Sequence, residues 1–389
     1  MEQGLELERR RAVERFRAGE RPSAIAASLG YSTWWVWKWV KRAASGDVDW
    51  YKERSRQPHS SPSRVDSALE GQILQVRDRL QEQGCFHGAQ AILWELEELG
   101  LRDLPSVRTV GRILARHGKV RRRSGRYRPK GKRYPAPDAT RVGEVQQMDF
   151  VGPRYGTAPL RFYSLNTVEL ATGRCAVEPV LSRDASSTLR AIWATWRRLG
   201  LPRIQQVDNE MVFFGSPRHP RGMGPLIRLC LHHGVEPLFI PVREPWRNGV
   251  VEKFNALYEQ RFRRLVHLED QASLERESRR FEAHHNARYR YSKLGGRTPT
   301  AALRASGQIV RYPNEVEPPE HPLPKPTRGR YHIVRFIRSD RVLDLFGERF
   351  TLPPVATYEY VRATVDVEAQ HLSVHLDEEL IHEQKYRLR

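Results

Sequence analysis

The amino-acid sequence predicts a multidomain α+β protein, with helix-turn-helix units at the N-terminus, a mixed sheet covered by helices in the centre, and a small β-barrel at the C-terminus. The length of 389 residues suggests two to four domains. Helical periodicity prevails up to about residue 118, strands and helices alternate over 141–300, and apolar and polar residues alternate from about residue 329. Hydrophobic residues make up 39% of the chain, so real cores can form and wholesale disorder is excluded.

The charge indicates a polyanionic partner. Lysine and arginine outnumber aspartate and glutamate by 66 to 46, which gives a formal net charge of +20. Counted along the chain, the excess is +11 over 1–140 and +9 over 141–300, whereas 301–389 is neutral. We therefore expect nucleic acid to meet the first two parts of the chain.

Composition argues against several other classes of protein. Cys85, Cys175 and Cys230 lie far apart and form no CxxC pair, which disfavours a disulfide scaffold or a cysteine-based zinc site and fits a reducing cytosol. No apolar run approaches the ~18 residues of a membrane span, and the N-terminus lacks the apolar segment of a secretory signal. We expect a cytoplasmic protein.

Residues 1–50 are predicted to form a helix-turn-helix domain of three short helices. Gly19 and Gly30 end the first two helices, and Ser32 can cap the third, TWWVWKWVKRAA. In this third helix the buried stripe consists of Val36, Trp39 and Val40. The side chains left for DNA are Trp34, Lys38, Lys41 and Arg42. A helical bundle without a DNA role, or a protein-contact module, is the alternative.

A linker rich in serine, proline and arginine over 54–64 precedes a second helix-turn-helix-like domain at 64–118. Its last helix begins after Pro105-Ser106, and Arg108 and Arg112 are available to phosphate.

A basic linker arm over 119–140 follows. Its first part, 119–133, holds nine basic residues and no acidic one, so it is expected to lie along DNA and release counterions. The arginines assigned to this contact are Arg121, Arg122, Arg123 and Arg126. A solvated spacer that self-repulsion extends is the alternative.

The centre, 141–300, is expected to form a mixed sheet with helices on its faces. The predicted strands cover 144–153, 160–169, 173–180, 203–208 and 235–242, and the helices 187–199, 225–233, 249–268 and 272–288. Regular alternation of apolar and polar residues after a proline-rich connector predicts the separate β-barrel at 325–389.

Three carboxylates stand out in the centre. Asp149 interrupts an apolar strand, Asp208 ends the fourth strand, and Glu252 lies near the start of the long helix after PWRNG. A charge inside an apolar strand is costly without a role. Carboxylates suit Mg²⁺, and two such ions can activate an attacking oxygen and stabilise the leaving oxygen of a phosphoryl transfer.

The motifs MDFVG, QVDNEMVF and PWRNGVVEKFN, in this order, resemble the catalytic core of the retroviral-integrase superfamily, particularly bacterial insertion-sequence transposases with a DDE triad. The resemblance spans nearly the whole chain and implies a ribonuclease H-like core at 141–300. It implies that Asp149, Asp208 and Glu252 are the catalytic metal ligands. It also matches accessory positions at Asn209, Asn248, Gly249 and Asn255.

The sequence departs from that family at two points. The second aspartate and the glutamate are separated by 43 residues instead of about 35, and 213–225 is the expected insertion. Glu244 is therefore a rival to Glu252, but it precedes PWRNG. The histidine-cysteine zinc domain of retroviral integrases is absent, and the pairs at 232–233 and 284–285 are interpreted as ordinary helix residues without cysteine partners. Glu169 and Glu210 are expected to be ion-pair or surface groups.

The resemblance predicts a DNA transposase that cleaves 3′ ends of a mobile element and transfers them into target DNA. The expected cofactor is a pair of Mg²⁺ ions, for which Mn²⁺ can substitute. The expected partners are double-stranded element ends and target DNA, further copies of the chain, and a helper ATPase, close to a bacterial nucleoid. A catalytically inactive DNA-binding regulator and a nuclease without joining activity are the alternatives.

Overall fold

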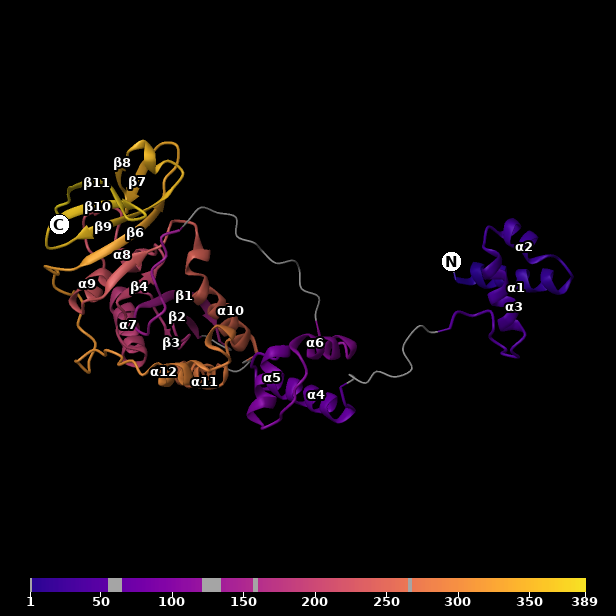
Figure 1. Cartoon of the computed structure of the whole chain (residues 1–389). Helices are drawn as coiled ribbons and strands as arrows, with labels where there is room; N and C mark the ends of the chain where they lie inside the picture. The colour runs from indigo at the N-terminus through magenta and orange to yellow at the C-terminus, as the bar shows by residue number, and fades with distance from the viewer. Residues whose placement is uncertain (1, 55–64, 121–133, 157–159, 265–267) are drawn as a thin grey trace. The chain divides into compact units, whose positions relative to one another are not determined.

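The computed structural model describes residues 2–54, 65–120, 134–156, 160–264 and 268–389. The chain divides into two compact units, Met1–Asp66 and Ser67–Arg389. Figure 1 gives the labels of the elements used below. The linker at 55–64 and most of the basic arm, including the four arginines predicted to contact DNA, lie outside the described residues.

The first unit contains the three short helices that the sequence predicts. They are α1 (Glu2–Arg17), α2 (Pro22–Leu29) and α3 (Thr33–Ala43). Gly30 ends α2 in the left-handed conformation at φ 72°, and the Ser32 hydroxyl accepts a hydrogen bond from the Trp35 N–H at 3.2 Å. Val36 and Trp39 are buried, as expected, and Val40 is half-buried.

The second unit opens with α4 (Ser67–Glu82), α5 (Ala89–Glu98) and α6 (Val107–Arg116). Ser106 caps α6 by accepting from the Thr109 N–H at 3.2 Å. This helical group rests on the segment that follows α11 (Gln271–Arg288). Arg290 forms ion pairs with Glu95 and Glu98, and the Tyr289 hydroxyl donates to the Gly84 carbonyl.

A nine-stranded sheet forms the body of the second unit, in the order β11-β10-β9-β6-β5-β4-β1-β2-β3. Its strands are β1 (Val145–Tyr155), β2 (Arg161–Glu169), β3 (Cys175–Val180), β4 (Ile204–Val207), β5 (Glu236–Phe239), β6 (Arg330–Phe336), β9 (Tyr360–Asp366), β10 (His371–Leu376) and β11 (Glu379–Lys385). The β1–β4, β4–β5 and β5–β6 pairs are parallel, and the other adjacent pairs are antiparallel.

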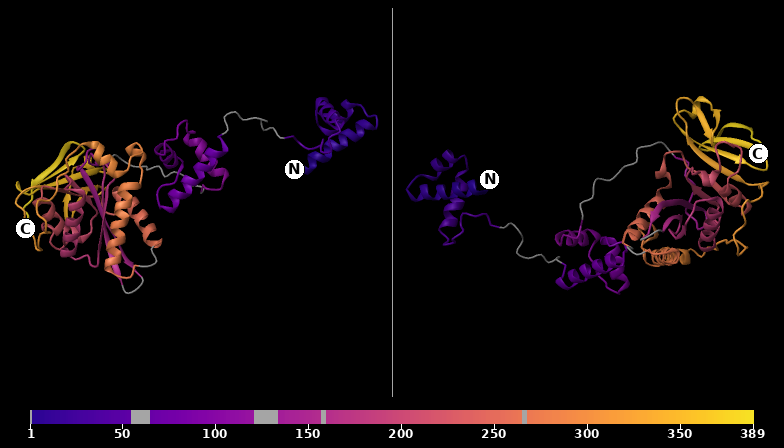
Figure 2. Two further views of the ribbon diagram at one scale, coloured as in Figure 1. Left: turned by 90° about the horizontal axis from the view of Figure 1, so that it is seen from below. Right: turned by 180° about the vertical axis from the view of Figure 1, so that it is seen from behind.

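Helices cover both faces of the core part of this sheet (Figures 1 and 2). One face packs Met148 of β1 against α7 (Ala185–Leu199) and α9 (Pro225–His232) in the main core. The other face packs Val168 of β2 against α10 (Gly249–Arg264) and α11. Because side chains alternate along a strand, Asp149 points to the face that α10 covers.

The separate C-terminal β-barrel is not confirmed. Strand β6 pairs with β5 in parallel, so β6, β9, β10 and β11 continue the central sheet instead of closing on themselves. Only β7 (Val342–Leu345) and β8 (Glu348–Thr351) form a hairpin of their own among the described strands. The apolar side chains of β6, β9 and β10 belong to the same core cluster as α7 and α9. Because β6 pairs with β5, the segment expected to form a separate barrel at 325–389 shares its sheet with the predicted core at 141–300.

Several short elements were not predicted. They are α8 (Met211–Phe214), α12 (Pro299–Ser306) and the 3-10 turns η1 (Pro245–Asn248), η2 (Ser292–Leu294) and η3 (Pro354–Ala356). The segment expected to be an insertion packs on the C-terminal strands, where Arg221 pairs with Glu348 at 2.5 Å. No helix in the described ranges combines the length and apolarity needed to cross a membrane.

Candidate active site

The sheet brings two of the predicted carboxylates to neighbouring strands. Gln147 of β1 is opposite Gln206 of β4, and continuing this parallel register places Asp149 opposite Asp208. Adjacent strands lie about 4.8 Å apart, so the two side chains start from neighbouring positions. Glu252 belongs to the first turn of α10, which packs on the face to which Asp149 points.

Burial acts on all three acids, and nearby negative charges act on two of them. Burial, and then the nearby charges of Asp208, Glu210 and Glu252, raise the pKa of Asp149 to about 7. Burial, and then the charge of Glu210, raise the pKa of Asp208 to about 6. Burial also raises the pKa of Glu252. The site is therefore an acidic cluster whose ionised form is unfavourable without a compensating cation.

Asp149 is held by a chain of amides. The Asn255 side-chain N–H donates to Asp149 Oδ2 at 2.7 Å, and Asn255 Oδ1 accepts from the Asn166 side chain at 2.8 Å. The Ser164 hydroxyl donates in turn to Asn166 Oδ1 at 2.7 Å. Val251, Phe254 and Tyr258 are buried beneath α10, so Glu252 and Asn255 turn toward the site.

The start of α10 is fastened to β1, the strand that carries Asp149. The buried Asn248 amide donates to the Met148 carbonyl at 3.0 Å, one residue before Asp149. Gln147 Oε1 accepts the N–H groups of Val250 and Val251, which are free donors at a helix start. Gly249 adopts φ −63° with open space around its missing side chain, and nothing in the structure explains glycine there.

Asn209 links the second aspartate to the C-terminal strands. Its side-chain N–H donates to the Ile240 carbonyl at 2.6 Å, and its oxygen accepts from Arg335 at 2.9 Å. Arg335 is buried on β6 and also donates to the carbonyls of Ile240 and Asp344. Burial lowers the pKa of this guanidinium to about 10. Sequence reasoning missed Arg335, although an arginine within an apolar strand was a usable signal.

The rival Glu244 is occupied elsewhere. It pairs with Arg247 at 3.0 Å and accepts hydrogen bonds from the Tyr360 hydroxyl at 2.9 and 2.8 Å. The Arg247 guanidinium also lies 4.1 Å from the Tyr134 ring centre. This network holds η1 against β9. Because Glu244 is engaged there, Glu252 is the better candidate for the third acid beside Asp149 and Asp208.

The other two rivals have structural partners. Glu210 pairs with Arg183 at 2.9 Å, as an ion-pair group was expected to do. Glu169 is not a surface group, because it is only 2% exposed. Its carboxylate accepts the backbone N–H groups of Ala171 and Thr172 and so closes the turn after β2.

One of the two histidine pairs, at 284–285, differs from the expectation. His284 contacts Cys85 Sγ at 3.4 Å, and His285 contacts Cys175 Sγ at 3.2 Å, so cysteine partners do exist. Burial lowers the pKa of His285 to about 4, and its other ring nitrogen meets the Tyr291 hydroxyl. Each histidine has one cysteine beside it, which is too few ligands for a zinc site.

A cavity of about 640 Å³ opens beside the acids, and Asp149, Glu252 and Asn255 line it, whereas Asp208 does not. Within the described ranges, no three histidine, cysteine, aspartate or glutamate side chains lie close enough to hold one metal ion together. The donor set itself is hard oxygen, which fits Mg²⁺, but the three carboxylates have to approach one another to share a cation.

The predicted DNA-binding side chains of α3 differ in their exposure to solvent and in their contacts. Trp34 is 71% exposed and Lys41 is exposed. Lys38 and Arg42 are half-buried: Lys38 lies 3.5 Å from Glu53, and Arg42 donates to the Lys52 carbonyl. Trp37, which sequence reasoning passed over, is 50% exposed.

On α6, Arg108 and Arg112 are exposed one turn apart. Neither has an ion-pair partner within the described part of the chain.

Known proteins match separate parts of this chain. The sequence model of one family, described as a homeodomain-like domain, matches residues 4–51. The HTLV-2 integrase catalytic core domain in complex with magnesium, in its dimeric form, aligns at 15% identity with a TM-score of 0.34, over 42% of this chain and 97% of that one. The trimeric form of that domain aligns at 15% identity with a TM-score of 0.33, over 41% and 95%.

The catalytic core domain of BIV integrase aligns at 16% identity with a TM-score of 0.33, over 42% of this chain and 95% of that one. The match to the homeodomain-like family over residues 4–51 confirms the N-terminal helix-turn-helix domain. Because the likeness to integrase cores is distant, any assignment of activity depends on the carboxylates and their surroundings.

Proposed function

We propose that this protein is a DNA transposase of the DDE type, which frees 3′ ends of a mobile element and joins them to target DNA. The observation that carries the proposal is the arrangement of Asp149, Asp208 and Glu252. Two acids occupy matching positions on adjacent parallel strands, and the third lies in the first turn of the helix that covers the same face. The motifs around them have the order found in integrase-like enzymes.

The chain's own residues prepare the site for phosphoryl transfer. Asp149 accepts a hydrogen bond from Asn255. The start of α10 is fixed to β1 through Asn248, so the backbone from which the Glu252 side chain extends is fixed as well. Burial and nearby negative charges make the ionised forms of Asp149 and Asp208 unfavourable, and a bound cation would offset that cost. A pair of Mg²⁺ ions held by these three acids would activate the attacking oxygen and stabilise the leaving oxygen, and Mn²⁺ would substitute.

The remaining parts of the chain would bind the DNA. We assign duplex binding to α3 and to Arg108 and Arg112 of α6, with the basic arm at 119–133 following the phosphate backbone between the modules and the core. Homo-oligomers on DNA and a helper ATPase belong to the same proposal. So do the boundaries at 1–50, 64–118, 119–140 and 141–300.

A joining assay tests this function. Full-length protein is incubated with Mg²⁺ and end-labelled DNA that carries the sequences flanking its gene, together with a plasmid target. We expect nicked and joined products from the wild type and none from Glu252→Gln. Glu244→Gln is the matched control, because the amide keeps an acceptor for Tyr360 and should leave joining intact. Nicks without joined products would support the nuclease alternative, and equal activity of Glu252→Gln would remove this residue from the site.

A further inference from the structure

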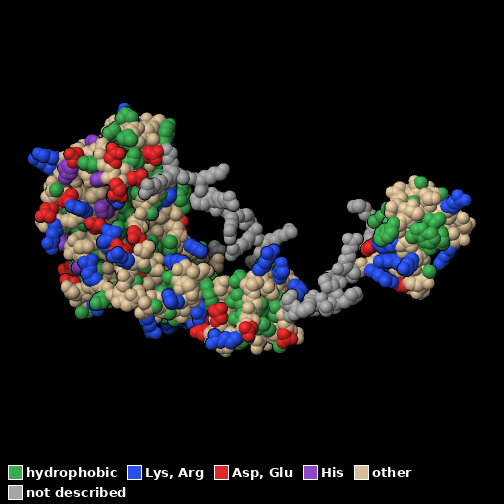
Figure 3. Space-filling view, in the orientation of Figure 1, with side chains coloured by type: hydrophobic (Ala, Val, Ile, Leu, Met, Phe, Trp, Pro, Cys, Tyr) green, Lys and Arg blue, Asp and Glu red, His purple; other side chains and the backbone are tan. Residues whose placement is uncertain are grey.

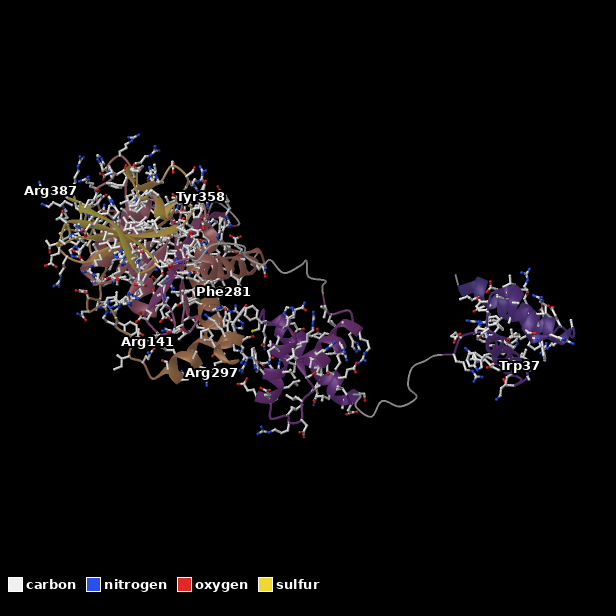
Figure 4. The ribbon with its side chains drawn as sticks, turned by 45° about the horizontal axis from the view of Figure 1, so that its top comes forward. Trp37, Arg141, Phe281, Arg297, Tyr358 and Arg387 are labelled. Atoms are coloured by element: carbon white, nitrogen blue, oxygen red, sulfur yellow. The ribbon has the colours of Figure 1, made fainter. Side chains whose placement is uncertain are left out.

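Two of the four tryptophans on α3 are exposed, and the other two are not. The side chains of Trp34 and Trp37 are 71% and 50% exposed, whereas Trp39 is 1% exposed and Trp35 stacks on Tyr31 with ring centres 4.0 Å apart. Hydrophobic side chains gather on the face of this unit that Figure 3 shows, beside lysine and arginine side chains, and Figure 4 labels Trp37 on the same unit. Adjacent large apolar side chains in water commonly mark an interaction site.

The spacing places both rings on one ridge of the helix. Residues three apart lie on the same face, and their positions differ by about 4.5 Å along the axis. This rise is close to the separation of consecutive base pairs, about 3.4 Å. Lys38 and Lys41 follow one turn later on the same ridge, with the Lys38 ammonium 6.0 Å from the Trp34 ring centre.

The order of side chains along α3 fits one way of docking. The second helix of a helix-turn-helix motif directs its N-terminal residues to base edges in the major groove. Trp34 and Trp37 occupy that N-terminal half, and the cations come later, where they can meet phosphate. Trp37 is held against Phe16 with ring centres 5.3 Å apart, so its ring has a fixed support.

The chemistry of the indole selects the base. An indole has an apolar surface and a single N–H donor, and it has no acceptor. In the major groove only thymine presents an apolar group, the C5-methyl, and it lies beside the O4 acceptor. Adenine is read better by bidentate asparagine or glutamine side chains, neither of which α3 contains, and guanine by arginine or lysine side chains, which on this ridge come only after the two rings.

We propose that Trp34 and Trp37 read the C5-methyl groups of thymines on neighbouring base pairs in the DNA that the first unit binds. The inference rests on the proposed function, because it requires duplex DNA as the ligand. A positively charged ridge next to the rings favours this occupant over a second copy of the chain. The rings themselves cannot neutralise phosphate, so their contribution is to sequence preference.

Deoxyuridine tests the proposal because it lacks only the methyl group. A duplex is first selected for tight binding to the full-length protein from a random pool, and we expect enrichment of neighbouring thymines. Each thymine is then replaced by deoxyuridine, and Kd is measured by fluorescence anisotropy. Loss of one buried methyl contact should weaken wild-type binding about 3- to 10-fold at the positions read by the rings.

Variants connect each ring to its methyl group. Trp34→Ala and Trp37→Ala should each bind the selected duplex more weakly and should no longer distinguish thymine from deoxyuridine at one position. Val48→Ala is the matched control, because Val48 is 88% exposed outside α3 and should change neither quantity. Circular dichroism and the unfolding temperature of each variant show that the first unit remains folded.

Three results would overturn the inference. The first is wild-type affinity that no deoxyuridine changes while the duplex still binds specifically, which leaves the proposed function untouched. The second is a loss of affinity in both variants that is equal for thymine and deoxyuridine, which indicates backbone contacts. The third is that Trp34→Ala and Trp37→Ala bind DNA as the wild type does, while light scattering shows that an oligomer has become a monomer. That result indicates a protein interface. A chain that selects no duplex at all overturns the proposed function as well.

Discussion

Replacing Asp149 by asparagine should stabilise the metal-free protein, by an amount that grows with pH. The pKa of this carboxyl rises from its ordinary 3.8 to about 7, first because of burial and then because of the neighbouring acids. A raised pKa in the folded state means that ionisation opposes folding. The opposing free energy is absent below pH 4, increases between pH 4 and pH 7, and is complete above pH 7.

The size of the effect follows from the same two pKa values. One pKa unit corresponds to about 1.4 kcal/mol, so Asp149→Asn should raise the free energy of unfolding at pH 8 by at most about 4 kcal/mol. At pH 4 the two proteins should be almost equally stable. Asparagine also retains an acceptor for the Asn255 amide, so the comparison isolates the charge.

Urea unfolding of the full chain in EDTA, followed by tryptophan fluorescence at pH 4, 6 and 8, measures this difference. Asp184→Asn is the control of opposite sign, because backbone N–H groups of the α7 start lower the pKa of Asp184 to about 2. That variant should show no gain that grows with pH. Addition of Mg²⁺ should stabilise the wild type and not Asp149→Asn. Equal gains at pH 4 and pH 8, or a loss at pH 8, would refute the electrostatic account of the site.

Other parts of the chain carry further predictions. Asn248→Ala leaves the Met148 carbonyl without its buried donor, and it should cost about 1–3 kcal/mol in urea unfolding at every pH, unlike Asp149→Asn. Arg108→Ala should weaken terminal DNA binding in anisotropy titrations by about 1–3 kcal/mol if it reads a base, with relaxed sequence preference, and an unchanged Kd would exclude it from the interface. The last variant replaces four arginines of the basic arm with glutamine: Arg121, Arg122, Arg123 and Arg126. Loss of these cations should reduce the slope of log K against log [salt] by up to about 3–4 without changing sequence preference. An unchanged slope would show that the arm is a spacer.

Local features were predictable because nearby residues decide them. Ser32 caps α3 through its own hydroxyl, and the alternation around Asp149 turns its carboxylate away from Met148 and Phe150. The packing stripe of α10 likewise directs Glu252 toward the site. In each case the side chain's direction follows from helical or strand periodicity.

Long-range partners were not predictable in the same way. The alternation in 360–376 defines two faces of a strand pair, but it does not say that β6 will join β5 instead of closing a barrel. The same limit applies to Glu244, whose hydrogen-bond partner Tyr360 lies 116 residues away.

The central claim is that Asp149, Asp208 and Glu252 hold the catalytic metal, and a cysteine substitution tests it most directly. Mg²⁺ takes hard oxygen ligands, whereas Mn²⁺ is a transition metal that accepts softer ones. Joining is measured for Asp208→Cys in each metal, with Glu210→Cys as the control beside it. We predict that Asp208→Cys is inactive with Mg²⁺ and regains joining with Mn²⁺, while the control is active with both. Joining by Asp208→Cys in Mg²⁺ at the wild-type rate would contradict the account.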